Sequence, residues 1–327
     1  MNPISAATIT AMLADGANGK AVEELESVLG DVGDIKEYLK SYNSSLSGID
    51  TLKTSTAIWG KSGYPFKQSY FDGISANYNA ELNTNATFDE TTLNEIEQWV
   101  FDNTGGMIDS NLSSFSKDTT LVLANTSWFE CGFKYAFDVN LTVGGKFTAS
   151  DGSVQDVEMM YSPMESASIT SDASYFIKQY KDERFSFIAV LPNGELEDYI
   201  ASLDAEKLTE ILNPSMVTTA KIIMPKFECS YKTNLSDILK DLGAESAFAY
   251  PADFSNISDN DLYIELLEQQ SKITVDEQGT YGASATIGVV ASGAVDRTIT
   301  FDRPFMYIIA DTQTNVPVYI GTVSNLK

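Results

Sequence analysis

The sequence contains no histidine, and this absence excludes several kinds of active site at once. A Ser-His-Asp triad, a Cys-His pair, a histidine metal site and a histidine pH switch all need the imidazole ring. Cysteine is almost as scarce, because Cys131 and Cys229 are the only two in 327 residues. Two cysteines cannot form a metal cluster or a disulfide scaffold. Each lies in or beside an apolar run, so we expect buried free thiols, with a single disulfide as the alternative.

Long apolar runs are also lacking. No stretch reaches the roughly 20 apolar residues that span a bilayer. Residues 1–16 contain no basic residue and no unbroken hydrophobic run, so they do not read as a signal peptide and are expected to begin a helix of the fold. We expect an extracellular or cell-surface protein whose leader is not in this sequence, with a cytoplasmic location as the alternative.

Positive charge is scarce as well. Lys and Arg total 21 against 46 Asp and Glu, which gives a net charge of −25. This charge repels nucleic acids, heparin-like polymers and anionic membranes, so we expect none of them as a partner. Hydrophobic residues make up 43% of the chain, which is enough to build a sizeable core.

Motifs for a cofactor or a metal are incomplete. Residues 55–63, STAIWGKSG, approach a phosphate-binding loop, but Ser55 stands where the first glycine is needed. Asp259 and Asp261 have the alternate spacing of calcium ligands, but no glycine follows where such a loop must turn. We therefore expect no cofactor and no metal, and a helix-capping turn at the two aspartates.

Apolar residues recur at helical spacing in two segments, 91–100 and 233–243. In the second segment Asn234 is suited to the N-cap and Gly243 to the end of the helix. Runs rich in β-branched and aromatic residues predict strands. These runs are 119–129, 185–192 and 219–227.

The C-terminal residues 304–323 predict two strands joined by a polar turn from Asp311 to Asn315. Helical and strand patterns interleave along the chain, and neither a low-complexity linker nor an internal repeat divides it. The sequence therefore predicts one mixed α+β domain over residues 1–327.

One segment near the C-terminus combines properties of a loop and of a buried strand. Between Glu277 and Asp296 there is no charge and no proline, and almost every side chain is small. Successive residues of a strand point to opposite faces, and here both parities are small. Charges and prolines would oppose entry into a packed sheet, and both are missing. The pattern predicts a segment that leaves the surface and becomes a central strand.

Short motifs along nearly the whole chain resemble those of the serpins, in the family's order. They are Asn2-Pro3-Ile4-Ser5-Ala6, YNAEL (78–82), EIEQWVFDNTGGMI (95–108), LVLANTSWFECGFKYAFD (121–138), VEMMY (157–161), IIMPKF (222–227), EQGTYGASAT (277–286) and DRPFMYII (302–309). The family's first helix has no counterpart. The resemblance implies the serpin fold, with three β-sheets, a large central sheet, about eight helices and an exposed reactive-centre loop at about 277–298.

The resemblance implies a suicide-substrate inhibitor of serine proteases, not an enzyme. A protease attacks the loop and forms an acyl-enzyme, and the cut loop then enters the central sheet as a new strand. Inserting about 15 residues carries the protease on the order of 50 Å, because each strand residue adds ~3.3 Å. Distorting the oxyanion hole then stalls deacylation. The expected partner is the target protease, in a covalent complex with a monomer; the alternative is a non-inhibitory serpin used for binding or storage.

The reactive bond implied by the family's spacing is Gly293–Ala294. Counting 16 residues on from Glu277 reaches Gly293, and counting back from Pro304 reaches the same residue. Cleavage after Ala291 or Ser292 is the alternative. All these side chains are small, which favours elastase-like or subtilisin-like proteases over trypsin-like ones.

Two further groups of residues carry roles in the resemblance. The hinge of the loop corresponds to Glu277, Gly279, Thr280, Gly282, Ala283, Ser284, Ala285 and Thr286. The shutter and breach, which control opening of the central sheet, correspond to Ser5, Asn125, Gln269 and Phe133. Gln269 stands where the family has a histidine and keeps a hydrogen-bond donor and acceptor. Phe133 stands where the family has a tryptophan, with the bulk kept and the N–H lost.

Overall fold

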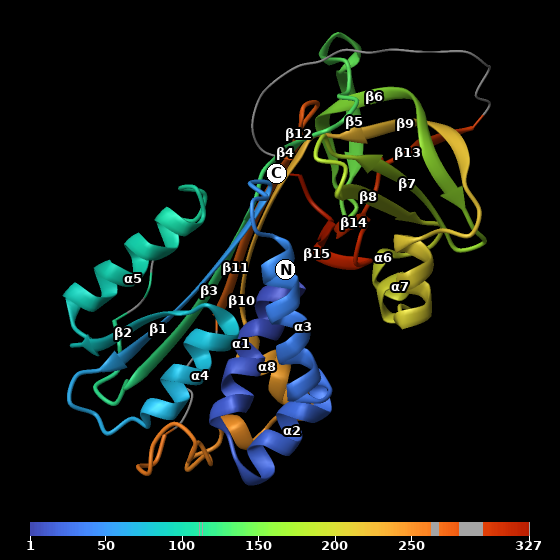
Figure 1. Ribbon diagram of the computed structural model, residues 1–327. Coiled ribbons are helices and arrows are strands. Elements are labelled where there is room, and N and C mark those ends of the chain that lie inside the picture. Colours follow the sequence, from blue (N-terminus) through green and yellow to red (C-terminus); the bar gives the residue numbers. More distant parts are fainter. Residues whose placement is uncertain (111, 113, 263–267, 281–296, 327) are drawn as a thin grey trace. The chain divides into compact units, whose positions relative to one another are not determined.

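Figure 1 shows the computed structural model, in which helices and strands interleave as the α+β prediction requires. The structure describes residues 1–110, 112, 114–262, 268–280 and 297–326. The described residues contain eight α-helices, in agreement with the prediction. They form two compact units, made of residues 1–3, 129–230 and 272–327 and of residues 4–128 and 231–271.

Helices dominate the second of these units. They are α1 (Pro3–Gly16), α2 (Gly19–Leu29), α3 (Val32–Ser45), α4 (Gln68–Tyr78), α5 (Glu90–Asn103) and α8 (Leu235–Asp241). Helices α5 and α8 confirm the two helical predictions. The N-cap of α8 is Asn234, whose side chain accepts from the backbone N–H of Ser236. No helix in the described ranges is both long and apolar enough to cross a membrane.

A three-stranded sheet lies in the same unit, in the order β2 (Glu81–Ala86), β1 (Leu52–Lys61) and β3 (Leu121–Phe129). Its core joins the strands to α5, because Ile96 of the helix packs with Ala57 and Trp59 of β1. In the described chain β3 is an edge of this sheet and pairs with β1 alone. The strand predicted at 119–129 is therefore present, with one long side unpaired.

A second sheet has the order β10 (Phe227–Asn234), β11 (Glu268–Val275), β12 (Gly279–Thr280) and β4 (Cys131–Gly132). Strands β3 and β4 follow one another along the chain with only Glu130 between them. Together with the large sheet described next, the described residues thus contain three β-sheets, the number that the resemblance implied. β12 is the short strand that fills the space between β11 and β4.

The largest sheet belongs to the first unit. Its order is β13 (Thr298–Thr300), β9 (Thr218–Pro225), β6 (Val154–Ile169), β7 (Ala173–Gln179), β8 (Phe185–Pro192), β14 (Phe305–Asp311) and β15 (Val316–Val323), with β5 (Val143–Thr148) also paired to β6. Helices α6 (Leu196–Ala201) and α7 (Ala205–Leu212) pack on it through Leu196, Tyr199 and Ile211. Every residue of β8 is buried, which explains why the strand is apolar apart from Ser186. The strands predicted at 185–192 and 219–227, and the turned pair at 304–323, are confirmed.

A buried ion pair closes the β14–β15 turn. The side chains of Arg184 and Asp311 are 6% and 0% exposed, and their closest atoms, Nη2 and Oδ2, are 2.6 Å apart. Arg184 Nε also donates to the same oxygen at 2.8 Å. The other oxygen of Asp311 accepts from the backbone N–H of Gln313 at 3.0 Å. The carboxylate thus joins the turn to β8.

Arg184→Met is expected to lower the free energy of unfolding by about 3–5 kcal/mol, because it leaves the Asp311 carboxylate buried without a counter-charge. Lys207→Met is a matched control, since Lys207 and Asp172 form an ion pair in which both side chains are more than a third exposed. Its loss is expected to cost less than about 1 kcal/mol. Thermal or urea unfolding measures both. Equal losses would contradict the role given to the buried pair.

Candidate functional site

The structure describes only the first part of the reactive loop suggested by the resemblance. Glu277, Gly279 and Thr280 lie within the described residues. The bond at Gly293–Ala294, its alternatives Ala291 and Ser292, and hinge residues 282–286 lie outside them. The site is therefore built from the hinge start and from the strands on either side of it.

Gly279 and Thr280 already form a strand, β12, that is antiparallel to both of its neighbours (Figure 1). Thr280 lies opposite Val275 of β11 on one side and Cys131 of β4 on the other. Its side chain is only 1% exposed. The loop therefore starts from inside a sheet.

A tight turn brings the chain from β11 into β12. One carboxylate oxygen of Asp276 accepts from the backbone N–H groups of Gln278 and Gly279, at 2.8 and 3.2 Å. The N–H of Asp276 donates to the carbonyl of Gly279 at 3.0 Å. This is the side-chain-capped turn that aspartate favours. It fixes the direction in which the loop leaves β11.

Glycine is required at position 279. The residue has φ +155°, and an added Cβ would lie 2.3 Å from the carbonyl oxygen of Cys131 and 2.7 Å from Cα of Gly132. Both of these are backbone atoms, which cannot move aside as the end of a side chain can. Close approach of the two strands therefore depends on this residue.

Three residues from other parts of the chain hold the hinge. The backbone N–H of Phe133 donates to the carbonyl of Gln278 at 2.7 Å, and that of Phe137 donates to the carbonyl of Glu277 at 2.9 Å. The hydroxyl of Tyr180 makes a 2.5 Å hydrogen bond with Oγ1 of Thr280. Tyr180 is fully buried and stacks on Phe133, with ring centroids 5.1 Å apart. Burial raises the pKa of Tyr180 well above its usual value, so this hydroxyl stays protonated. We call these contacts of residues 277–280 the hinge seat.

Glu277 is charged although it is only 5% exposed. Its carboxylate accepts from Thr142 Oγ1 at 2.7 Å and lies 2.9 Å from the ammonium of Lys226. Desolvation raises the pKa of this carboxyl. The hydrogen bonds from Thr142 and Lys226 lower the pKa by more than desolvation raises it, so the pKa lies below its usual value of 4.5. The carboxylate fixes the hinge start to two other segments of the same unit.

The shutter residues form a separate cluster in the unit made of residues 4–128 and 231–271. The hydroxyl of Ser5, on α1, donates to Oδ1 of Asn125 on β3, and Nδ2 of Asn125 donates to Oγ1 of Thr56 on β1 at 2.8 Å. Gln269 is buried on β11. The structure thus brings Ser5 and Asn125 together, whereas Phe133 belongs to the hinge seat.

Sequence reasoning missed Thr142, Tyr180 and Lys226. These residues lie between 51 and 135 positions from the hinge residues that they contact. Thr142 and Tyr180 belong to no quoted motif, and Lys226 lies in IIMPKF, but nothing local marks a tyrosine or a lysine as a partner of a distant glutamate or threonine. Only the pairing of the strands brings them to the hinge.

Neither cysteine forms a disulfide, and both are partly exposed rather than buried as predicted. Cys131 lies on β4 opposite Thr280, and Cys229 lies on β10. Burial of the sulfur raises the pKa of Cys229 to about 11, so its thiol is protonated at neutral pH. The disulfide alternative is therefore wrong for this structure.

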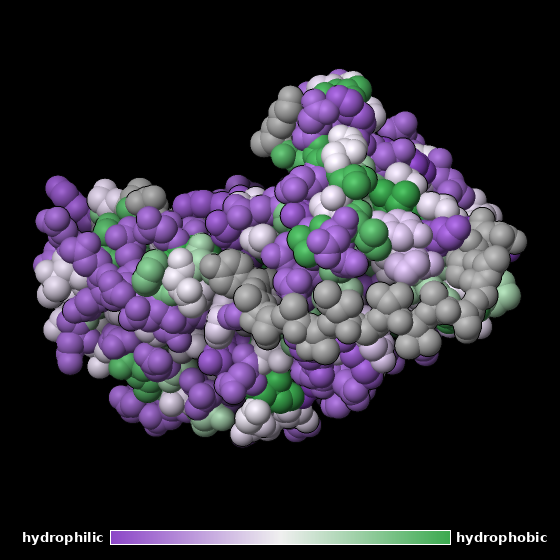
Figure 2. All heavy atoms as spheres, turned by 90° about the horizontal axis from the view of Figure 1, so that it is seen from above, coloured by the Kyte–Doolittle hydropathy of each residue, from purple (hydrophilic) through white to green (hydrophobic). Residues whose placement is uncertain are grey.

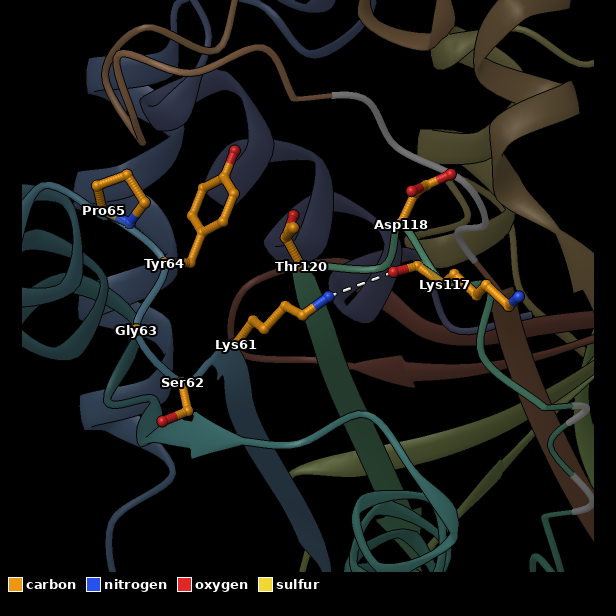
Figure 3. Close-up of a pocket in the computed structure, with 8 residues that line it drawn as sticks. All are labelled: Lys61, Ser62, Gly63, Tyr64, Pro65, Lys117, Asp118 and Thr120. Atoms are coloured by element: carbon orange, nitrogen blue, oxygen red, sulfur yellow. Dashed lines mark hydrogen bonds between the residues drawn. The ribbon is translucent and has the colours of Figure 1, made fainter.

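The segment that approaches a phosphate loop borders a cavity of about 360 Å³ (Figure 3). Lys61 points across it and donates to the carbonyl of Lys117 at 3.3 Å. Lys61 ends β1, and the next helix begins only at Gln68, so no helix N-terminus follows the lysine as a phosphate loop requires.

Asp259 and Asp261 lie in a bend between two isolated bridges, not in the predicted helix-capping turn, and Asp259 pairs with Lys67 at 2.6 Å.

Glu277→Gln is expected to lower the melting temperature at neutral pH and to have little effect under acidic conditions. The pKa of Glu277 is lower in the folded protein than in the unfolded chain, so its stabilisation is complete above the unfolded value of about 4.5. It is lost as the pH falls through the folded value. Glu228→Gln is the control, because Glu228 pairs with Lys272 while 53% exposed. Parallel pH profiles for the wild type and Glu277→Gln would contradict this account.

Comparisons with known proteins agree on one family. The family model described as serpin (serine protease inhibitor) matches residues 1–326. A serpin-like protein of Thermococcus kodakarensis is 30% identical over 100% of this chain and 80% of its own length. Alpha-2-antiplasmin of Bos taurus is 26% identical over 99% of this chain and 67% of its own.

The solved structures agree with this assignment. Tengpin, a thermophilic serpin solved in its native state, has a TM-score of 0.91 and 31% identity over 100% of this chain and 88% of its own. Human thyroxine-binding globulin is 20% identical with a TM-score of 0.88, and this likeness shows the fold alone. This chain therefore belongs to the serpin family.

Proposed function

We propose that this serpin is a suicide-substrate inhibitor of serine proteases. The observation that carries the proposal is β12, because the loop starts as a strand buried between β11 and β4. The residues from Gln278 to Val295, which begin in this strand, carry no charge and no proline. A strand that has started between two neighbours, and continues in small residues, can lengthen without burying a charge.

The register of β12 tells which partners the lengthening strand would meet. Paired residues of β12 and β4 have numbers that sum to 411, as for Thr280 with Cys131 and Gly279 with Gly132. Continued along the chain, this register sets Gly282 opposite Phe129 and Val290 opposite Leu121, which are the two ends of β3. The unpaired side of β3 therefore has the length needed to receive residues 282–290.

The energy of this step accounts for an irreversible inhibitor. About ten added strand residues at ~1 kcal/mol per hydrogen bond amount to roughly the whole net stability of a domain. The intact form must then be kept from inserting its loop by a kinetic barrier. Cleavage removes the tether at one end, and the protease is carried along because it is bound to the loop as an acyl-enzyme.

The target class in this proposal is elastase-like or subtilisin-like. The proposed bond, Gly293–Ala294, and its alternatives after Ala291 and Ser292 all lie in a run of small side chains. The deep specificity pocket of a protease that cleaves after basic or aromatic residues would stay empty against this run, whereas a shallow pocket would be filled. A protease of this kind is the natural first choice for the test.

Mixing the protein with pancreatic elastase tests the proposal on a denaturing gel. A covalent band at the summed mass is expected, because the acyl-enzyme survives denaturation. Catalytically inactive elastase is the control and gives no such band. A chain that is cut in the loop by every small-residue protease tried, with no covalent band, would contradict inhibition and favour a binding or storage protein.

Thr280→Arg is expected to turn the inhibitor into a substrate. The threonine side chain is 1% exposed and is bonded to Tyr180, so an arginine there must bury an unpaired charge or leave the sheet. The covalent band should fall by about tenfold or more while the cleaved band grows. Thr298→Arg is the control, because Thr298 is exposed at the start of β13. Unchanged complex yield in Thr280→Arg would refute the role of the hinge.

A further inference from the structure

A buried ion pair lies close to the hinge seat, in the same unit. Lys178 of β7 is 3% exposed and Glu165 of β6 is 12% exposed, and the ammonium lies against the carboxylate. Ser162 Oγ donates to the same carboxylate oxygen at 2.7 Å. Two charges in such a position lose most of their hydration, and removing either one leaves the other uncompensated.

The ammonium of Lys178 also lies over two aromatic rings. Its Nζ is 4.3 Å from the ring centroid of Phe137 and 5.4 Å from that of Phe133. The two rings meet edge to face, with an interplanar angle of 76°. A cation within about 6 Å of a ring centroid is attracted by the ring, and this attraction grows when water is excluded. One charge thus fixes the position of both rings.

These two rings belong to residues that hold the hinge. The backbone N–H groups of Phe133 and Phe137 bind the carbonyls of Gln278 and Glu277. Phe133 also stacks on Tyr180, the partner of Thr280. Three aromatic residues thus contact the hinge. The rings of two of them lie under Lys178, and the ring of the third stacks on one of these two.

We propose that Lys178, neutralised by Glu165, is a positioning residue for the hinge seat, and that it sets how often a cleaved loop inserts before the protease escapes. The second half of this proposal rests on the proposed inhibitory function. The first half concerns the intact protein alone. An apolar side chain at position 178 could fill the same volume, but it would not draw both ring faces toward one point.

The main variant is Lys178→Met, which keeps the length of the side chain and removes the charge. It leaves Glu165 buried without a counter-charge, so the double variant Glu165→Gln/Lys178→Met is the second test and carries no unpaired charge. Arg184→Met is the matched control. It breaks the other buried pair of the same unit, and no contact of the hinge seat described above involves Arg184 or Asp311.

The first measurement is hydrogen exchange of backbone amides 133–137 and 276–280 in the intact protein. Exchange at these amides is expected to become about fivefold faster in Lys178→Met and in the double variant, the change that corresponds to the loss of about one hydrogen bond. Arg184→Met is expected to lower the melting temperature and leave exchange at the hinge seat unchanged. The proposal would be overturned if the hinge-seat amides of the double variant exchanged at the same rate as those of the wild type.

The second measurement is the number of inhibitor molecules consumed per elastase molecule inactivated. It is expected to rise by about fivefold in both Lys178 variants, with the rate of the first encounter unchanged, because the loop sequence is the same. An unchanged number beside faster exchange would overturn the link from seat to insertion. If the wild type forms no covalent complex, the proposed function fails, while the exchange measurement still decides whether Lys178 positions the hinge.

Discussion

The burial of Thr280 between β11 and β4 is the constraint on which the rest of this molecule depends. Because this residue is already paired on both sides, the proposed insertion would begin with its direction and register set. The Asp276 turn and the absent side chain of Gly279 make this geometry possible. In the proposed mechanism the loop would therefore only have to extend a strand that has already begun.

Charge is placed around the hinge rather than within the segment that follows it. Glu277 stands at the start and is held by Lys226 and Thr142, while the next eighteen residues carry no charge. Below the hinge, Lys178 is matched by Glu165. Glu277 and Lys178 thus each have a partner of opposite charge, and in the proposed mechanism only the uncharged segment has to change place.

Local signals predicted the elements that depend on neighbours in sequence. The caps of α8, the periodicity of α5 and the mostly apolar run of β8 depend on residues close together in the sequence, and the structure has them where expected. Lys178 shows what the sequence could not reveal. It follows the apolar residues of β7 as an ordinary solvent-facing lysine would, and only Glu165 on the adjacent strand makes its burial possible. The place of β12 between β11 and β4 was hidden for the same reason, since pairing across a sheet leaves no mark in either strand.

The shutter residues can be understood from the same register. Asn125 uses its amide oxygen and nitrogen to bind Ser5 of α1 and Thr56 of β1, so its side chain ties β3 to the helix and the strand on its paired side. In the proposed mechanism the other side of β3 receives a new strand, and this tie would keep β3 in place before that strand arrives. If β12 lengthened in its present register with β4, Thr286 would lie opposite Asn125, because paired residue numbers sum to 411. In the proposed mechanism Asn125 would thus anchor β3 near the middle of its pairing with the inserted strand. A slip in register there would misplace every small residue that follows.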